Sequence, residues 1–418
     1  MELTPPIEMS DSYPRVVEEV ARLAGLPKVR AAFEWFRSEE PQFAAWQMGA
    51  ARIAAPPFGE GARGAWLADR FRDLGLKDVQ ADEVGNVFGV HPGYGSRSVA
   101  LSAHIDTVFP ATTPLNVRQQ GSRLYGPGVS DNGAGIAAML AVAGAIRAAR
   151  ISHAQPFVFI GNVGEEGEGD LRGMRHVFST ARWRDSIAYC VIVDGAGSDT
   201  VVAEALGSRR FEVIVRGPGG HSWSDFGAPN PIIVLARAIE AFGQTPVPVA
   251  PKTTFNVGVI RGGTSVNSIP ESASMRVDLR STSMTEIDRL ERALRGAVDQ
   301  AIEEEHRTAA AHGRRKPQAL QSEVVAIGNR PAGELATDTR ILKVIRAVDA
   351  QLGNVAQVQR ASTDANIPLS LGREAIAVGG GGSGGGAHTL QEWFDSSGRD
   401  LGLRRILLTM LTLSGVGE

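Results

Sequence analysis

The stretch Val99-Ala-Leu-Ser-Ala-His-Ile-Asp-Thr-Val-Phe-Pro110 decides how the rest of the chain is interpreted. Its mostly apolar start predicts a strand from Val99 to Ala103, and residues two apart on a strand face the same side, so His104 and Asp106 can touch. A histidine that binds a metal usually donates its other ring N–H to a carboxylate. The stretch therefore indicates either a metal ligand with its supporting carboxylate or an ordinary hydrogen-bonded pair at a strand end.

A second stretch follows closely, Tyr125-Gly-Pro-Gly-Val-Ser-Asp-Asn-Gly-Ala-Gly-Ile136. A Pro-Gly turn leads to Asp131, and the alanine-rich run from Gly133 to about Arg150 predicts a helix. A carboxylate is electrostatically favoured near a helix N-terminus. Asp131 is thus either a second metal ligand or simply the N-cap of that helix.

The composition describes a globular chain of 418 residues, 43% hydrophobic and 21% charged, which is long enough for two domains. A formal net charge of -3 gives no electrostatic reason to expect nucleic acid or an anionic membrane as a partner. Cys190 is the only cysteine, which excludes an intrachain disulfide and a cysteine-based zinc site. The first residues, Met1–Pro6, show no secretory signal and no run of about 18 apolar residues occurs, so we expect a cytoplasmic protein.

Predicted helices and strands alternate along the first half of the chain. The helices are expected from Tyr13 to about Ala55, at Arg63–Leu74, from Gly133 to about Arg150 and at Leu171–Thr180, and the strands at Asn86–Val90, Val99–Ala103, Phe157–Val163 and Tyr189–Val193. This alternation predicts an α/β fold with a mostly parallel sheet and helices on both faces, in which ligands bind beyond the carboxyl ends of the strands. His104, Glu165-Glu166 and Asp194 each follow a strand and should converge there.

A different pattern begins at about Ser208. Its elements are a strand at Phe211–Val215, a helix from Asn230-Pro231 to about Phe242, strands at Thr254–Ile260 and Ala273–Arg280, a helix opened by the capping box Ser283-Met-Thr-Glu286, and a strand at Gln318–Ile327. The order β-α-β-β-α-β is that of the ferredoxin-like fold. We expect residues 208–329 to form a domain inserted into a larger one made of residues 1–207 and 330–418.

The returning segment leads to another histidine. After a predicted helix at Thr337–Leu352 and a strand at Glu374–Val378, the run Gly379–Gly386 is interrupted only by Ser383 and ends close to His388. A run this rich in glycine is either a flexible linker or a place where the backbone approaches a ligand closely. It joins a strand to a histidine rather than one domain to another, which favours the second interpretation.

Imidazoles and carboxylates thus gather just past predicted strands or at a helix start: His104, Asp131, Glu165, Glu166, Asp194 and His388. Nitrogen and oxygen ligands of this kind suit two zinc ions. Adjacent side chains in an extended loop diverge, so one of Glu165 and Glu166 can bind metal while the other acts as a general base. Taken by itself, Gly164-Glu-Glu-Gly-Glu-Gly169 would be a solvated acidic turn.

Six motifs occur together: Ala103-His-Ile-Asp-Thr-Val108, Gly128-Val-Ser-Asp-Asn-Gly-Ala-Gly135, Gly164-Glu-Glu-Gly167, Val193-Asp-Gly195, Gly219-Gly-His-Ser222 and the glycine-rich approach to His388. With them the chain resembles, over nearly its whole length, the zinc peptidases and deacylases that include peptidase T, glutamate carboxypeptidase, aminoacylase, acetylornithine deacetylase and succinyl-diaminopimelate desuccinylase. The resemblance implies a di-zinc catalytic domain interrupted by a ferredoxin-like lid.

The resemblance also implies a role for each ligand-type residue. One zinc ion would be bound by His104, Asp131 and Asp194. The other would be bound by Asp131, Glu166 and His388. Asp131 would bridge the two ions, Asp106 would support His104, and Glu165 would be the general base.

The same resemblance assigns three residues of the inserted domain. His221 would donate to the oxyanion, often across a dimer interface, although alone it could be a turn histidine. Asn267 and Arg280 match positions that bind substrate carboxylate or carbonyl groups, and a guanidinium suits a carboxylate. Arg280 could instead pair with Asp278 on the sheet surface.

The implied function is a zinc-dependent hydrolase that cleaves amide bonds of short peptides, as a di- or tripeptidase, through a metal-activated water. The run Gly164-Glu-Glu-Gly-Glu-Gly-Asp-Leu-Arg-Gly173 looks closest to the peptidase T-like branch. The implied cofactor is two Zn²⁺ per subunit, with Co²⁺ or Mn²⁺ as alternatives, and the implied assembly is a homodimer formed through the lid. A deacylase of N-acyl amino acids is the alternative enzyme, and a non-catalytic zinc-binding scaffold is the alternative from another class.

Overall fold

The computed structural model describes residues 12–312 and 319–416, which divide into two units. Unit 1 contains the described residues up to Ala205 and from Gly333 onward, and unit 2 contains Leu206–Ala332. The predicted boundaries of the inserted domain, 208 and 329, lie two and three residues inside those of unit 2. Met1–Pro6 and Gln318, which entered the sequence predictions, lie outside the described residues.

Unit 1 is built on one large sheet. Its strands follow the order β1 (Lys77–Ala81), β2 (Val87–His91), β6 (Phe157–Asn162), β3 (Ser98–His104), β7 (Ile187–Val193), β17 (Glu374–Val378), β8 (Thr200–Ala205) and β15 (Gly333–Glu334), with β16 (Gln357–Ala361) also paired to β8. The central strands β6, β3, β7 and β17 are parallel, as predicted, whereas β1, β2 and β15 pair antiparallel, so the sheet is mixed. β8 pairs antiparallel with β17 and β15 but parallel with β16. β3 and β6 are buried along their whole length, which explains their almost continuous apolar sequences.

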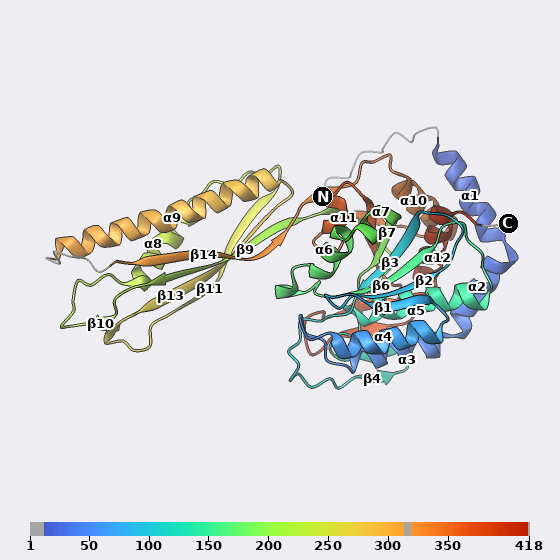
Figure 1. Ribbon diagram of the computed structural model, residues 1–418, viewed down its shortest axis with the longest axis horizontal. Helices are drawn as coiled ribbons and strands as arrows, with labels where there is room; N and C mark the ends of the chain where they lie inside the picture. Colours follow the sequence, from blue (N-terminus) through green and yellow to red (C-terminus); the bar gives the residue numbers. More distant parts are fainter. Residues whose placement is uncertain (1–11, 313–318, 417–418) are drawn as a thin grey trace. The chain divides into compact units, whose positions relative to one another are not determined.

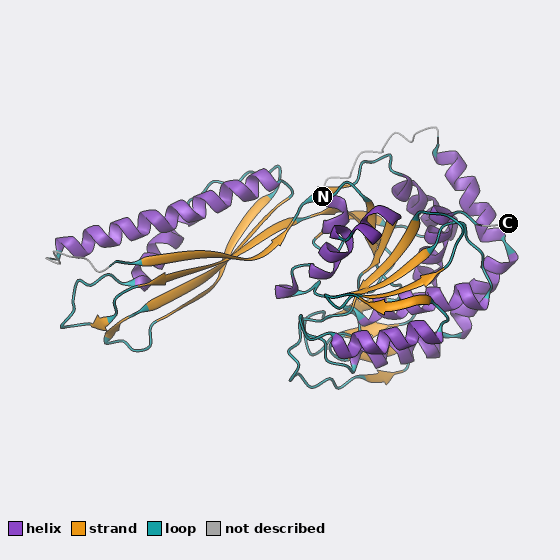
Figure 2. Ribbon diagram, in the orientation of Figure 1, coloured by secondary structure: helices purple, strands orange, loops and turns teal. Residues whose placement is uncertain are grey.

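Helices cover both faces of this sheet (Figure 2). One face packs against α1 (Tyr13–Gly25), α2 (Pro27–Ser38), α3 (Glu40–Ala51), α4 (Gly61–Asp73), α5 (Gly133–Ala148), α10 (Arg340–Leu352) and α12 (Arg399–Ser414). The other face packs against α6 (Arg172–Ser179), α7 (Ala181–Ser186) and α11 (Asn366–Ser370). In the described part of the chain, every helix is too short or too polar for a membrane span.

A second, small sheet of unit 1 carries the glycine run. Its strand order is β18 (Ser383–Gly385), β19 (Trp393–Asp395), β5 (Arg123–Tyr125) and β4 (Arg118–Gln120). A Cβ at Gly381 would lie 2.4 Å from the backbone oxygen of Arg399, and one at Gly384 would lie 2.3 Å from the Ser130 hydroxyl. The run is therefore a tightly packed segment, and the flexible-linker interpretation is wrong.

Unit 2 has the predicted ferredoxin-like topology (Figure 1). The elements are β9 (Gly207–Arg216), α8 (Pro231–Gly243), β11 (Thr253–Gly262), β13 (Ser272–Ser281), α9 (Met284–Ala311) and β14 (Gln321–Arg330), in an antiparallel sheet of order β11-β13-β9-β14. Both helices begin at predicted caps: Asn230 Oδ1 accepts from the N–H of Ile232, and Ser283 Oγ accepts from that of Glu286. A separate short pair, β10 (Gly220–His221) with β12 (Ser268–Ile269), carries His221.

Candidate metal centre

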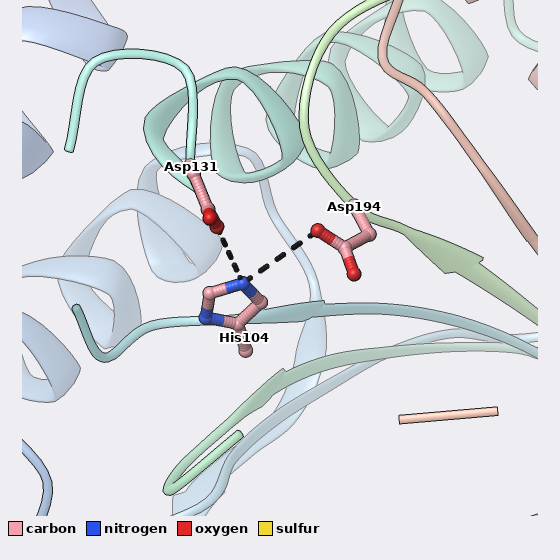
Figure 3. A group of neighbouring side chains, drawn as sticks. All are labelled: His104, Asp131 and Asp194. Atoms are coloured by element: carbon pink, nitrogen blue, oxygen red, sulfur yellow. Dashed lines mark hydrogen bonds and ion pairs between the residues drawn. The ribbon is translucent and has the colours of Figure 1, made fainter. Parts of the chain in front are cut away.

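His104 lies at the end of β3, where two carboxylates reach its ring (Figure 3). Its Nε2 atom is 3.1 Å from Asp131 Oδ1 and 3.8 Å from Asp194 Oδ1. Asp194 directly follows β7, the neighbour of β3, so the two parallel strands bring His104 and Asp194 to one edge of the sheet. Asp131 comes from the turn before α5, as predicted.

Asn132, which the sequence interpretation passed over, fixes this turn. It is the N-cap of α5: its Oδ1 accepts from the N–H of Gly135 at 3.1 Å and from that of Gly195 at 3.0 Å. Its Nδ2 donates to the carbonyl of Val193 at 2.9 Å. The interpretation of Asp131 as the N-cap is therefore wrong, because its neighbour caps the helix and leaves the Asp131 carboxylate facing His104.

A second group forms around His388. Its Nε2 atom lies 2.8 Å from Glu166 Oε1 and 3.1 Å from Asp131 Oδ2. The two oxygens of Asp131 thus face different histidines, His104 on one side and His388 on the other. The interpretation of Gly164–Gly169 as a solvated acidic turn is also wrong, since Glu165 and Glu166 are only 5% and 7% exposed.

Asp106 holds both the histidine and the glutamate loop. The Nδ1 atom of His104 is 3.2 Å from the backbone oxygen of Asp106 and 3.5 Å from its carboxylate. The same carboxylate accepts from the backbone N–H of Glu165 at 3.0 Å and from that of Glu166 at 2.8 Å. The predicted contact between His104 and Asp106 is present. Asp106 also holds the loop of Glu165 and Glu166, which strand spacing could not reveal because that loop follows a different strand, β6.

Glu165 reaches into the same space as its neighbour. One carboxylate oxygen of Glu165, one of Glu166 and one ring nitrogen of His104 all lie within 4.8 Å of one another. The side chains of Glu165 and Glu166 therefore diverge less than expected for adjacent residues in an extended loop. Glu166, and not Glu165, belongs to the group around His388.

Of the three groups whose ligand atoms lie close enough to hold a cation, two share Asp131: His104 with Asp131 and Asp194, and Asp131 with Glu166 and His388. Ligand atoms that are each about 2.1 Å from one zinc ion lie roughly 3.4 Å apart in tetrahedral geometry. In these two groups the separations between the histidine nitrogens and the carboxylate oxygens, from 2.8 to 3.8 Å, lie near that value. The donor set consists of imidazole nitrogens and carboxylate oxygens, which are ligands for zinc, cobalt or manganese.

The ionisable side chains of the cluster shift one another's pKa values. Hydrogen bonding to Asp131 raises the pKa of His388 to about 9. Although burial disfavours its charged form, His104 also has a raised pKa because Asp106, Asp131 and Asp194 accept from it. Burial and the nearby Asp131 raise the pKa of Glu166. Carboxylates outnumber imidazoles here, so bound cations would supply the positive charge that protons on the histidines otherwise provide.

The residues predicted in unit 2 lie in two different places. His221 is exposed on β10, and its Nδ1 atom accepts from the N–H groups of Trp223 and Ser224 at 3.2 and 3.4 Å. This pattern places the proton of a neutral ring on Nε2, which becomes a donor. Asn267 is exposed beside it, since its backbone oxygen accepts from the N–H of Ser222 at 3.0 Å.

Arg280 is not brought together with His221 and Asn267. It lies at the far end of β13 from Ser272, and its Nε donates to Asp278 Oδ2 at 2.6 Å, the pairing considered as its alternative role. Ser272 pairs with Arg216, the end of β9 that leads to β10. Eight residues of strand, about 27 Å, therefore separate Arg280 from the His221 end of the sheet.

The family match, the related sequences and a similar solved structure agree with one another. Residues 100–410 match peptidase family M20/M25/M40. A probable carboxypeptidase of Ajellomyces dermatitidis is 30% identical over 222 residues, 49% of this chain and 50% of that protein. A succinyl-diaminopimelate desuccinylase of Xanthomonas oryzae pv. oryzae is 27% identical over 267 residues, 60% of this chain and 70% of that protein. Aminopeptidase PepT from Bacillus cereus has a similar crystal structure, with a TM-score of 0.70 and 19% identity over 90% of this chain and 98% of that chain.

The fold and the converging ligands define an α/β protein with a candidate centre for two cations. The chain belongs to peptidase family M20/M25/M40, since the match covers well over half of its length. The motif resemblance had predicted this membership. The chain spans about half the length of the carboxypeptidase that it matches.

Proposed function

We propose that this protein is a zinc-dependent hydrolase that cleaves the amide bonds of short peptides as a di- or tripeptidase. The observation that carries the proposal is the pair of ligand groups that share Asp131, with the buried carboxylate of Glu165 beside them. Shared carboxylates of this kind suit two cations that act on one substrate.

The residues of the chain divide the chemistry between them. Two bound divalent cations would polarise the substrate carbonyl and lower the pKa of a water molecule. Glu165 would take a proton from that water and later deliver it to the leaving amine. The Nε2–H of His221 would donate to the oxyanion, where a preoriented donor has its largest effect.

We further propose that the active protein is a homodimer joined through unit 2. Arg280 and His221 lie at opposite ends of the unit 2 sheet, so one substrate that contacts both would take them from different copies. In that arrangement Asn267 would accompany His221, because β10 and β12 pair with each other.

The competing function is removal of an acyl group from an N-acyl amino acid. The desuccinylase relative supports this alternative, because the match covers 70% of that protein. The run Gly164–Gly173 supports the peptidase, because it resembles the peptidase T-like branch most closely. Both reactions use the same ligands and the same general base.

A hydrolysis panel distinguishes these functions. Purified protein would be incubated with di- and tripeptides, each with free or blocked ends, and with acetylated and succinylated amino acids. We expect rapid cleavage of free di- or tripeptides, loss of activity after chelation, and recovery with zinc, cobalt or manganese. A Glu165→Ala preparation made in parallel would reveal contaminating peptidases.

Other outcomes would contradict the proposal. Preferential hydrolysis of acetylated or succinylated amino acids would establish the deacylase function. Full activity in demonstrably metal-free protein would exclude the proposed chemistry. Tight binding of two cations with no hydrolysis of any compound would indicate the non-catalytic zinc-binding scaffold.

A further inference from the structure

Glu392 is a buried carboxylate with an unusual set of partners. Its side chain is fully buried, with 0% exposure. Oε2 accepts from the N–H of Gly128 at 2.8 Å, and Oε1 accepts from those of Ser130 and Asp131, both at 2.7 Å. Its backbone oxygen accepts from the N–H of Gly126 at 2.9 Å. One residue therefore organises most of the turn that carries the shared ligand, Asp131.

The same residue belongs to the loop that carries His388. The N–H of Thr389 donates to Gly386 at 3.0 Å and that of Glu392 donates to Thr389 at 3.3 Å, so the chain turns tightly between His388 and Glu392. Asp131 and His388 are 257 residues apart in sequence, yet their side chains meet at 3.1 Å. Glu392 also connects their loops directly, through its hydrogen bonds to the backbone N–H groups of the Asp131 turn.

Burying the Glu392 carboxylate is unfavourable unless both of its oxygens accept hydrogen bonds. The side chain is fully buried, and its two oxygens together accept from three backbone N–H groups. A glutamine of the same shape would turn an N–H₂ group toward backbone N–H donors, which leaves a buried donor unpaired. The carboxylate is the side chain that can accept from all three N–H groups at once.

Glu392 affects the two cation groups unequally. Of the ligands Asp131, Glu166 and His388, two depend on loops that Glu392 joins. Of the ligands His104, Asp131 and Asp194, only Asp131 does, and Asn132 connects its turn independently to the end of β7. A displaced Glu392 side chain should therefore disturb the second group more than the first.

We propose that Glu392 is a positioning residue that sets Asp131 against His388 and so determines the affinity for the second cation. The proposal rests on the proposed function only in taking Asp131, Glu166 and His388 as cation ligands. Supporting groups behind metal ligands typically change metal affinity by roughly 10- to 100-fold.

The test measures zinc binding to metal-free protein by calorimetric titration, with no substrate present. Wild-type protein should bind two ions. Glu392→Gln should bind the first ion with nearly normal affinity and the second about 10- to 100-fold more weakly. Glu392→Asp keeps the charge but shortens the side chain, so it should fold readily and show a smaller loss of affinity for the second ion.

Asp82→Asn is the matched control. The Asp82 carboxylate also accepts from three backbone N–H groups, those of Val84, Gly85 and Asn86, but none belongs to a proposed ligand. All three donate to Oδ1, while Oδ2 accepts from Asn86 Nδ2 at 2.8 Å, so the new amide N–H₂ group would face a donor there. This variant should lose thermal stability and keep its affinity for both ions.

The proposal is overturned if Glu392→Gln and Glu392→Asp keep the wild-type affinity for the second ion, if Asp82→Asn loses as much, or if wild-type protein binds fewer than two ions. Wild-type protein that binds two ions but hydrolyses nothing would overturn the proposed function and leave this inference intact. The two failures are thus distinguishable.

Discussion

At the scale of single residues, adjacent glutamates provide the sharpest test of the chemistry. Glu165→Ala should bind two cations almost normally and lose roughly 10²–10⁴ in kcat, the usual contribution of a placed proton-transfer group. Glu166→Ala removes a partner of His388, so it should bind the second cation weakly, and excess zinc should restore part of the rate. Metal stoichiometry and kcat across a zinc titration check both outcomes. If Glu165→Ala is instead the variant that loses a cation, the two assignments are reversed.

A second residue-scale prediction concerns His153, which belongs to neither group of proposed cation ligands. Its Nδ1–H donates to the carbonyl of Gln155 at 2.7 Å, and its Nε2 faces Nδ1 of His91 at 2.7 Å. Nε2 must therefore accept a hydrogen bond from the Nδ1–H of His91, and a second proton on His153 would put two donors face to face. Burial accordingly lowers the pKa of His153 to about 4.

The pH dependence follows from that lowered pKa. The unfolded chain takes up a proton near pH 6.5, whereas the folded chain resists it down to about pH 4, so stability is lost as pH falls through this window. Between pH 7 and pH 5 the free energy of unfolding should fall by about 2 kcal/mol through this residue alone. Urea denaturation of metal-free wild type and His153→Asn at both pH values checks it. Equal losses in the two proteins would contradict the prediction.

Sequence reasoning identified the ligand-type residues and one supporting carboxylate, Asp106, but not the groups that hold the turn of Asp131. His104, Asp131, Asp194 and His388 were recognisable because each follows a predicted strand, helix start or motif. Glu392 was not, since it acts on backbone N–H groups more than 250 residues earlier, and such a contact leaves no local pattern. Asn132 could have been found, because asparagine is a preferred N-cap and it precedes the helix directly.

At the scale of elements, the sequence pattern predicted helices with one buried face and strands or helices that are continuously apolar, but it missed a buried helix that carries polar residues on every side and an exposed edge strand. α9 has an apolar stripe and a capping serine, and it was predicted from Ser283 onward. α12 was missed because nearly all its residues are buried, including Arg399, Arg405, Thr409 and Thr412, so polar and apolar residues do not alternate by face. β1, at the edge of the sheet, is mostly exposed and was missed as well.

Two N-cap asparagines give a prediction at this scale. Asn132 caps α5 and also bonds to Gly195 and Val193 near Asp194, whereas the side chain of Asn230 caps α8 in unit 2. Replacing either by alanine should cost about 1 kcal/mol of stability, the usual value for a lost cap. Only Asn132→Ala should also weaken binding of the first cation, because only Asn132 aligns ligands. Thermal unfolding and zinc titration of both variants check this, and equal zinc affinities would refute it.

At the scale of the whole molecule, the proposed dimer predicts complementation between inactive variants. If His221 completes the site of a partner, mixing His221→Ala with Glu165→Ala should restore about a quarter of the wild-type rate, because half of randomly exchanged twofold dimers are hybrids with one intact site. Hydrolysis by the mixture, compared with each variant alone, measures this. No recovery under conditions of demonstrated subunit exchange would argue that each chain completes its own site.

The position of β17 in the large sheet has a consequence for the order in which the chain folds during synthesis. β17 lies between β7 and β8, yet it leaves the ribosome after all of unit 2. The large sheet of unit 1 therefore lacks a central strand at the stage when Leu206–Ala332 already has all of its own strands. We expect the insert to fold before its host. A chain truncated after Leu352 should accordingly yield a protease-resistant fragment of unit 2, whereas its earlier residues are digested. His388 is made later still, after β17, so on the proposed assignment the group of Asp131, Glu166 and His388 is complete only after the whole of unit 2 has left the ribosome.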